Sequence, residues 1–360
     1  MHRRDFVRNV LGAGLLASGL TPIQPSYAGS ALATGSGRQV PYGAAIRVGH
    51  LSDDPNYAAA VRKYCQQVVG EGGLKWIDLR PTRSSFEFGD PDKLLAFAEE
   101  NGMTMRGHTL IWYSAMPEWV NEIDSRREAE FELEHHIEVV VGRYRGRIPS
   151  WDVVNEPIAD EPGKGNPLRD SVWYAQLGED YIDRAFRTAA AIDPKAQLVL
   201  NDFNFEEASV NSGDKRAAML DLLKGLKDRD VPIHALGLQG HLKGEAEIGK
   251  EELSKFVEEV RDLGLEILVT ELDVIDKNLP GTVYVRDQIV AKRVHDYLTA
   301  IYDVVEPRTV LTWGISDRYT WVPIWFSRRD GLPNRPLPLD EDYKPKAMMQ
   351  VLQQFTRAGQ

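Results

Sequence analysis

The sequence predicts an α/β fold, a single-domain (β/α)8 TIM barrel, on the strength of three observations. Strand-like and helix-like segments alternate along most of the chain. The strand-like segments are short and apolar, as expected for parallel strands that helices cover on the outside. Eight strand–helix units fit between residues 41 and 357, which matches a closed eight-stranded barrel. The alternative, an open doubly wound sheet, is disfavoured because residues 47–54 (RVGHLSDD) contain no G-x-G-x-x-G phosphate turn.

The eight strands are predicted from short runs of Val, Ile, Leu and aromatic residues that end at polar, Gly or Pro positions. In chain order they are residues 42–51, 74–79, 103–112, 150–157, 196–205, 233–242, 265–274 and 309–317. The helix after each strand is predicted from a longer segment in which apolar residues recur every three or four positions. These helices are residues 56–71, 91–102, 127–146, 178–194, 212–229, 250–264, 285–305 and 344–355.

Composition and charge limit the partners and cofactors. The formal net charge of −11 argues against nucleic acid or an anionic membrane surface. Cys65 is the only cysteine, so no internal disulfide can form, and we interpret it as a core residue. The histidines do not show metal-ligand spacing, so we expect no metal and no cofactor. His135 and His136 are predicted to lie on a solvated helix face, and the protein is predicted to be a monomer.

The N-terminal segment has the features of a twin-arginine export signal. Arg3 and Arg4 precede a short apolar run, and small residues suited to cleavage follow it. The run is too short and too rich in Gly for a stable membrane span, although a retained helical anchor is the alternative. We therefore expect export to the periplasm or the exterior, without membrane contact after cleavage. The predicted segments are the signal 1–28, with cleavage after Ala28 or Ala33, a flexible leader 29–40 and the catalytic domain 41–357.

Two glutamates end predicted strands, Glu156 in WDVVNEP and Glu271 in VTELDV. A barrel brings the C-terminal ends of its strands to one face, where barrel enzymes hold their active sites. Paired carboxylates in aromatic-rich surroundings favour glycoside hydrolysis, in which one carboxyl group is protonated and the other ionised. Pro157 should end the strand and hold Glu156 in an extended conformation.

Other polar and aromatic residues at the strand ends are assigned supporting roles. Asn155 is suited to hydrogen-bond a sugar hydroxyl, and His241 to orient Glu271 with support from Asp273. Residues expected to stack on sugars or to donate to hydroxyls are Trp112, Trp313, Trp321, Lys75 and His108. Tryptophans interpreted as core or wall are Trp76, Trp119, Trp151 and Trp173.

Three other functions fit parts of the same pattern. A metal-dependent barrel hydrolase usually begins with an H-x-H motif, which is absent here. A non-catalytic carbohydrate-binding barrel would not need both glutamates together with Asn155 and His241. A transglycosylase, or a hydrolase of a bacterial exopolysaccharide, would use the same carboxylates and differ only in its products.

Seven ordered motifs between about Tyr42 and Phe355 resemble glycoside hydrolase family 10, whose typical activity is retaining endo-1,4-β-xylanase. They are LKWIDLRPTRSSFEF, RGHTLIWYSAMPEWV, WDVVNEP, LGEDYIDRAFRTAAAIDPKAQLVLNDFN, LGLQGHL, VTELDV and TWGISDRYTW. The resemblance implies a (β/α)8 barrel that cleaves internal β-1,4 linkages of xylan-type polysaccharides, with Glu156 as acid/base and Glu271 as nucleophile. It places Glu71 and Asn204 on the two sides of the cleavage point, and implies a cis peptide between His108 and Thr109.

The resemblance also places the other supporting residues at substrate-site or nucleophile-supporting positions: Asn155, His241, Lys75, His108, Trp112, Trp313, Trp321, Gln239 and Asp273. The chain departs from the family pattern at four positions. Gly72 stands where Asn is usual, Tyr113 where His is usual, Ala115 where Gln is usual and Phe203 where Tyr is common. The loss of two hydrogen-bonding side chains, at 72 and 115, suggests a donor-side pocket that holds plain xylan less well. Decorated xylan, β-glucan or a bacterial exopolysaccharide are the alternative substrates.

Overall fold

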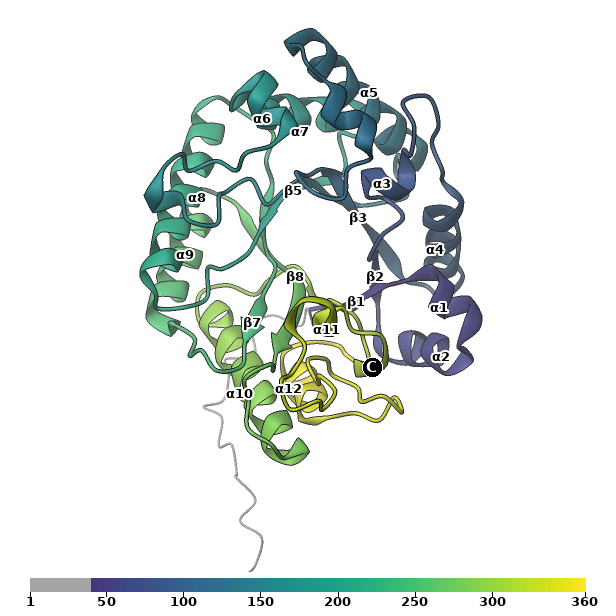
Figure 1. Cartoon of the computed structure of the whole chain (residues 1–360), viewed down its shortest axis with the longest axis vertical. Coiled ribbons are helices and arrows are strands. Elements are labelled where there is room, and N and C mark those ends of the chain that lie inside the picture. Colours follow the sequence, from purple (N-terminus) through teal and green to yellow (C-terminus); the bar gives the residue numbers. More distant parts are fainter. Residues whose placement is uncertain (1–39) are drawn as a thin grey trace, which may run out of the picture. The chain divides into compact units, whose positions relative to one another are not determined.

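The computed structural model describes residues 40–360, in which eight parallel strands form a closed ring (Figure 1). The ring strands are β1 (Tyr42–Ile46), β2 (Gln67–Gly70), β3 (Thr104–Ile111), β4 (Ser150–Asn155), β5 (Gln197–Asp202), β6 (Ala235–Leu238), β8 (Glu266–Ile275) and β9 (Val310–Thr312). Neighbours in this order pair in parallel, β6 pairs directly with β8, and β9 pairs with β1. The predicted (β/α)8 barrel is therefore confirmed. A short additional strand, β7 (His241–Lys243), pairs with the C-terminal part of β8.

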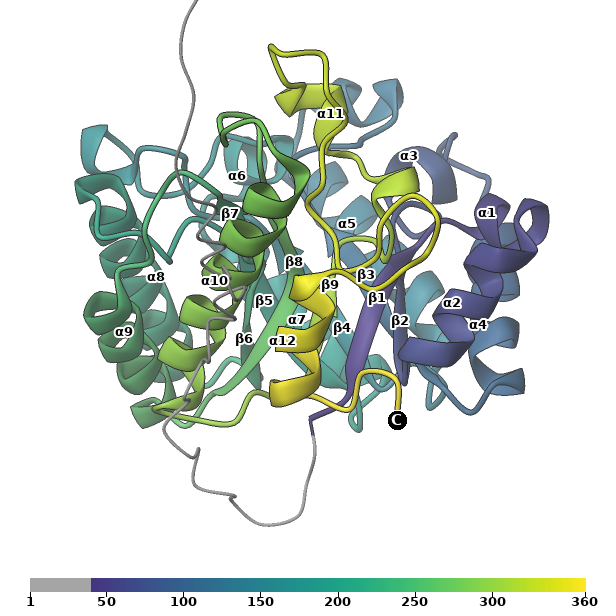
Figure 2. The same cartoon turned by 90° about the horizontal axis from the view of Figure 1, so that it is seen from below.

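The α-helices flank the ring, most of them on its outer side (Figures 1 and 2). They are α1 (Val48–Asp53), α2 (Pro55–Tyr64), α3 (Trp76–Leu79), α4 (Gly89–Glu100), α5 (Arg126–Tyr144), α6 (Val172–Leu177), α7 (Asp180–Ile192), α8 (Val210–Asp228), α9 (Lys250–Asp262), α10 (Val283–Tyr302), α11 (Val322–Phe326) and α12 (Ala347–Phe355). Figure 2 shows α11 projecting from one end of the barrel, while the long helices pack beside the strands.

Several helices begin at a side chain that caps them. Ser125, Ser171, Ser209 and Thr282 each accept a hydrogen bond from a backbone N–H in the first turn of α5, α6, α8 and α10. Such N–H groups have no partner within the helix, so the cap stabilises the helix start. The caps fix where each loop ends and each helix begins.

The apolar core lies mainly between the ring and its helices. One large cluster of buried residues includes side chains from both strands and helices. Two small clusters consist of strand-end and strand residues alone, for example Val199, Ala235 and Leu268 from three neighbouring strands, so they fill the inside of the ring. Gly107 on β3 pairs with Trp151 on β4, and a Cβ at 107 would lie 2.0 Å from the indole ring. Only glycine leaves room for that ring.

The second strand is Gln67–Gly70, and the prediction of a strand at 74–79 is wrong. Residues 76–79 form the single helical turn α3 instead. The segment QVVG follows α2 with no Gly or Pro between them, so its apolar residues merge into the helical pattern. A four-residue apolar run cannot be assigned by periodicity alone. Its pairing with β1 and β3 makes it a strand.

His136 is fully buried, which corrects its predicted place on a solvated face. Its ring stacks on Trp76 with 3.9 Å between ring centroids. Burial lowers the pKa of His136 well below its usual value, so the ring is neutral. His136 is buried because it lies on the same side of α5 as the buried residues Leu133 and Val140. Cys65 and the four tryptophans interpreted as core or wall are buried as predicted.

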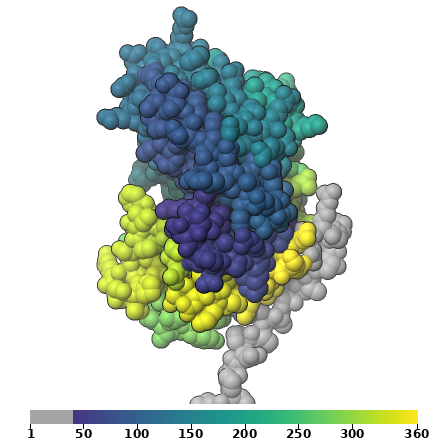
Figure 3. Space-filling view, turned by 90° about the vertical axis from the view of Figure 1, so that its right-hand side faces the viewer, coloured from purple at the N-terminus to yellow at the C-terminus, as the bar shows by residue number. Residues whose placement is uncertain are grey.

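The two ends of the described chain pack against each other (Figure 3). Arg357 donates its backbone N–H to the carbonyl of Val40 at 2.9 Å, and the Tyr319 hydroxyl donates to Asp54 at 3.0 Å. The predicted export signal and nearly all of its leader fall on residues 1–39, outside the described part, and stay predictions. Between residues 40 and 360 no helix has both the length and the apolarity needed to cross a membrane.

Candidate active site

A cleft of about 710 Å³ lies at the C-terminal ends of the ring strands. Every site residue predicted from the sequence lines it except Asp273, which is fully buried behind it. The lining residues among them are Glu71, Lys75, His108, Trp112, Asn155, Glu156, Asn204, Gln239, His241, Glu271, Trp313 and Trp321. The shared position at strand ends, from which the cleft was predicted, therefore does bring these side chains together.

Glu156 is held by three hydrogen bonds inside the cleft. Trp112 donates its indole N–H to Oε2 at 2.9 Å, while Gln239 and Asn155 donate side-chain amides to Oε1 at 3.0 and 3.2 Å. The residue is only 8% exposed. Burial raises the pKa of Glu156; the hydrogen bond from Gln239 opposes this, and the charges of Asp202 and Glu271 add to it. The net shift is upward, so Glu156 keeps its proton to a higher pH than an ordinary glutamate does.

The backbone at Glu156 differs from the prediction. Its φ is +54°, in the left-handed region and not in the extended region expected before Pro157. The Glu156 N–H still donates to the Asn201 carbonyl on β5 at 2.7 Å. The chain must therefore leave the sheet within one residue, and a left-handed residue makes that turn.

Glu271 lies on β8, 5% exposed, and accepts hydrogen bonds on both carboxylate oxygens. Asn201 donates to Oε1 at 2.7 Å, and His241 Nε2 lies 3.3 Å from Oε2. Burial acts to raise the pKa of Glu271, but the His241 hydrogen bond and the electrostatic influence of the neighbouring His108 and His241 imidazoles outweigh it. The pKa is lowered in sum, so the carboxylate is ionised. Glu156 and Glu271 are thus shifted in opposite directions.

His241 connects Glu271 to a buried support. Its Nδ1 lies 2.9 Å from Asp273 Oδ1, and Trp321 donates to the other Asp273 oxygen at 2.7 Å. Burial acts to lower the pKa of His241, but Asp273 and Glu271 on either side raise it well above its usual value. The imidazole is therefore held between two carboxylates as a cation, beside the two residues with which the sequence analysis grouped it.

Asn201 on β5 is a residue that the sequence analysis did not select. Its side-chain NH₂ donates to Asn155 at 2.8 Å as well as to Glu271, and its carbonyl oxygen accepts from Thr270 at 2.7 Å. One amide therefore ties β4, β5 and β8 together directly beneath both glutamates. The sequence feature that could have identified Asn201 is its position in NDFN, at the end of a predicted strand.

Basic and aromatic side chains form another part of the cleft wall. Lys75 Nζ lies 5.0 Å from the ring centre of Trp112 and 5.4 Å from that of Trp313. Burial lowers the pKa of Lys75, partly offset by Glu271, Glu71 and Glu156. His108 Nδ1 lies 3.0 Å from the buried Asp152, and the peptide between His108 and Thr109 is cis, as the family resemblance implied.

The rim of the cleft contains further residues that the sequence analysis missed. Arg47 pairs with Glu71 at 3.0 Å. Trp325 and Phe326, from the projecting helix α11, also line the cleft, and Trp325 is 73% exposed. An exposed tryptophan at a carbohydrate cleft offers a flat apolar face for a sugar ring. Within residues 40–360 no group of three or more His, Cys, Asp or Glu side chains is arranged to hold a metal ion.

Comparison with known proteins identifies the family. The model of the family described as glycosyl hydrolase family 10 matches residues 30–354. The chain is 34% identical over 299 residues to a β-1,4-xylanase of Dictyoglomus thermophilum, covering 81% of this chain and 82% of that protein. It is 32% identical over 302 residues to endo-1,4-β-xylanase B of Thermotoga neapolitana, covering 82% of each.

Solved structures agree with these relatives. The crystal structure of xylanase 10B from Thermotoga petrophila RKU-1 in complex with xylobiose superposes with a TM-score of 0.80 at 30% identity. The match covers 88% of this chain and 94% of that one. Native xylanase 10B from Thermotoga maritima gives a TM-score of 0.79 at 32% identity, covering 88% and 95%. The chain is therefore a glycoside hydrolase and belongs to glycosyl hydrolase family 10.

Proposed function

We propose that this enzyme cleaves internal β-1,4 linkages of xylan-type polysaccharides with retention of configuration, using Glu156 as acid/base and Glu271 as nucleophile. The observation that carries the proposal is the pair of buried carboxyl groups in one cleft whose pKa values are shifted in opposite directions. Such a pair supplies one proton donor and one ionised carboxylate at the same pH. The xylanase relatives support the choice of substrate.

The proposed reaction has two displacement steps. In the first, the Glu271 carboxylate attacks the anomeric carbon while Glu156 gives its proton to the departing glycosidic oxygen, and a glycosyl–enzyme ester forms. In the second, Glu156, now ionised, takes a proton from water as the water oxygen attacks the same carbon and releases Glu271. Gln239 and Asn155 keep the Glu156 carboxyl oriented through both steps by their hydrogen bonds. Two inversions at one carbon give overall retention.

The donor-side departures at Gly72 and Ala115 support an alternative substrate for the same chemistry. Ala115 offers no hydrogen-bonding side chain, and Gly72 offers none either. Each lost hydrogen bond is worth on the order of 1 kcal/mol of binding. Decorated xylan, mixed-linkage β-glucan or a bacterial exopolysaccharide would then be turned over as well as plain xylan, or better.

Turnover of a polysaccharide panel with product analysis tests the proposed function. We expect xylan to be cleaved at internal bonds, with a rapid fall in viscosity and with the β-anomer as the first product in proton NMR spectra. Release of the α-anomer would contradict the double displacement. A kcat/KM for β-glucan or exopolysaccharide above that for every xylan would favour the alternative substrate.

His241 should control the low-pH limb of activity. Glu271 attacks only when ionised, and its lowered pKa places that limb at a lower pH than for an ordinary glutamate. His241→Asn removes the imidazolium charge, so the pKa of Glu271 rises and the loss of kcat/KM begins at a higher pH. The kcat/KM of both proteins is measured across pH on a soluble xylo-oligosaccharide. His135→Asn, on the outer helix α5, is the control, and an unmoved limb in His241→Asn would refute the assignment.

A further inference from the structure

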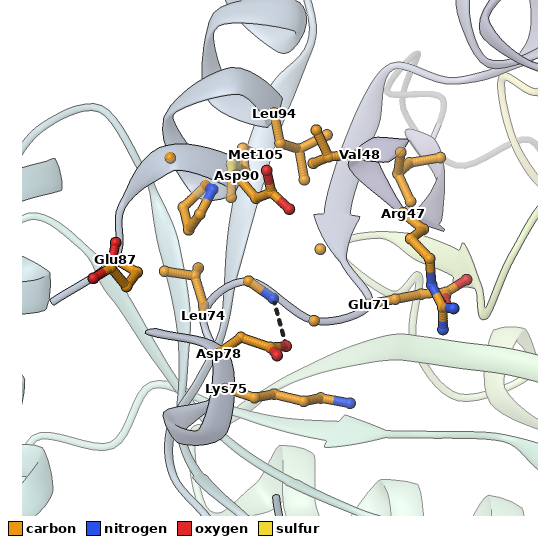
Figure 4. Close-up of a pocket in the computed structure, with 16 residues that line it drawn as sticks. Arg47, Val48, Glu71, Leu74, Lys75, Asp78, Glu87, Asp90, Leu94 and Met105 are labelled. Carbon is orange, nitrogen blue, oxygen red and sulfur yellow. Dashed lines mark hydrogen bonds and ion pairs between the residues drawn. The ribbon is translucent and has the colours of Figure 1, made fainter. Parts of the chain in front are cut away.

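A second cavity, of about 720 Å³, adjoins the catalytic cleft beside the turn between β2 and α3 (Figure 4). It shares Arg47, Glu71 and Lys75 with the cleft, so the two spaces meet at these side chains. Its volume is in the range of small-molecule binding sites. A polysaccharide lying in the cleft would therefore pass the mouth of this cavity, and a group attached to its main chain can enter it.

Two glycines form the turn that lines the cavity beside Asp78. A Cβ placed on Gly72 would lie 2.8 Å from Asp78 Oδ2, so a side chain at 72 would have to displace that carboxylate. Gly73 has a φ of +58°, which favours glycine, and its N–H donates to Asp78 Oδ2 at 3.2 Å. Asp78 therefore occupies the place beside the turn where a side chain at 72 would otherwise lie. Its Oδ1 accepts no hydrogen bond from any residue in 40–360 and is free to accept one from a ligand.

The wall of the cavity combines apolar surface with negative charge. Its apolar part is formed by Val48, Leu74, Pro91, Leu94 and Met105. Asp78, Glu87 and Asp90 line it as well, and Figure 4 shows Asp78 and Asp90 on either side of the glycine turn. The cations at its edge are engaged, since Arg47 pairs with Glu71 and Lys75 faces the rings of the cleft. The cavity is therefore an acceptor-rich site in which acidic groups outnumber available basic ones.

We propose that this cavity binds a neutral sugar substituent of the polysaccharide main chain and discriminates against a uronic acid at the same place. Carboxylates such as Asp78 accept hydrogen bonds from sugar hydroxyls, and the apolar wall suits the C–H face of a sugar ring. A uronic acid would bring a further negative charge beside Asp78 and Asp90, where like charges repel. The inference rests on the proposed function and names a substrate feature for that site.

Three xylo-oligosaccharides with the same main chain test it: one linear, one with an α-L-arabinofuranosyl branch and one with a glucuronosyl branch on the donor side. The full-length enzyme should cleave the arabinosylated compound at least as well as the linear one. It should cleave the glucuronosylated compound with a kcat/KM lower by roughly tenfold, the combined scale of two partly exposed charge contacts, with Asp78 and Asp90, of about threefold each. This penalty should shrink in about 0.5 M salt, because exposed charges are screened.

Asp78→Asn removes one of the charges while keeping the shape of the side chain. It should raise the kcat/KM for the glucuronosylated compound relative to the arabinosylated one by about threefold or more, as expected for one partly exposed charge contact. Asp124→Asn is the matched control, because Asp124 is an exposed acid that does not line the cavity. It changes the net charge equally and should leave the ratio unchanged.

Equal kcat/KM values for the two branched compounds, or a preference for the glucuronosylated one, would overturn the inference. So would the same change in ratio for Asp124→Asn as for Asp78→Asn. Failure to cleave any of the three compounds would contradict the proposed function instead. In that case the dissociation constants of the same compounds, measured by calorimetry, test the cavity. The arabinosylated compound should bind more tightly than the glucuronosylated one, and the reverse order or equal binding would overturn the inference.

Discussion

Glu271→Ala is expected to abolish turnover of xylan, with kcat/KM reduced by at least roughly 10⁴-fold, as when an enzymatic nucleophile is removed. The physical reason is that no other ionised carboxylate lies in hydrogen-bonding contact with both Asn201 and His241 in the described structure. The measurement is the steady-state rate on xylo-oligosaccharides. Azide, a small external nucleophile, should restore turnover of an activated aryl xyloside and give the α-glycosyl azide, with inverted configuration.

The control for this prediction is Glu138→Gln, an exposed position on the outer helix α5. It should retain the parent activity and the parent unfolding midpoint. Glu271→Ala should keep a barrel circular dichroism spectrum, so that the lost rate reports chemistry and not unfolding. Parent-level turnover by Glu271→Ala, or a β-glycosyl azide as its rescue product, would contradict the role of nucleophile.

Glu156→Gln should slow turnover by about 10²- to 10⁴-fold on xylan, the usual contribution of a general acid. The loss should depend on the leaving group. A natural sugar leaves as an alkoxide unless it is protonated, whereas a dinitrophenolate leaves without a proton. The first step should therefore remain fast on a dinitrophenyl xyloside while the second step, which lacks its base, becomes slow. Rapid-mixing kinetics should show a burst of dinitrophenol followed by a slow steady state.

The pH profile provides a second readout for the same variant. The raised pKa of Glu156 keeps the acid protonated to higher pH, and activity is lost as pH rises through that pKa. In Glu156→Gln this high-pH limb should disappear, while the low-pH limb set by Glu271 remains. Azide should give the β-glycosyl azide here. An equal loss on good and poor leaving groups would contradict the acid/base role.

The fold could be predicted where an apolar run is bounded by polar, Gly or Pro residues. The predicted ranges contain β1, β3, β4, β5, β6 and β9, and all of β8 except Ile275. The four-residue β2 could not be predicted in the same way, because its apolar run follows α2 with no Gly or Pro between them. Its pairing with β1 and β3 makes it a strand. The burial of His136 was also missed, since it depends on the phase of α5 against Trp76.

The grouping of the candidate site residues in one cleft could be predicted because strand ends in a barrel converge on one face. Glu156 and Glu271 were selected from their position at the end of a strand, whereas Glu71, Asn204 and Gln239 came from the family resemblance. Asn201 could not be selected from its position alone, because its importance lies in contacts to Asn155 and Glu271 that join residues from three strands. The left-handed backbone at Glu156 likewise follows from a hydrogen bond to β5, which no local rule for the residue before a proline includes.

Because the ring closes only when the first and last strands pair, catalytic activity depends on a late step of folding. β1 pairs with β2 on one side and with β9 on the other, so Tyr42 finds its second neighbour, Val310, only when nearly the whole chain has been made. Until then the first strand keeps an unpaired edge, and contacts this far apart in the sequence form slowly. Trp313, which follows β9 directly, completes the cleft wall around Lys75. The return of enzymatic activity during refolding therefore reports closure of the ring. Recovery of helical structure alone does not, because helices can form before the ring closes.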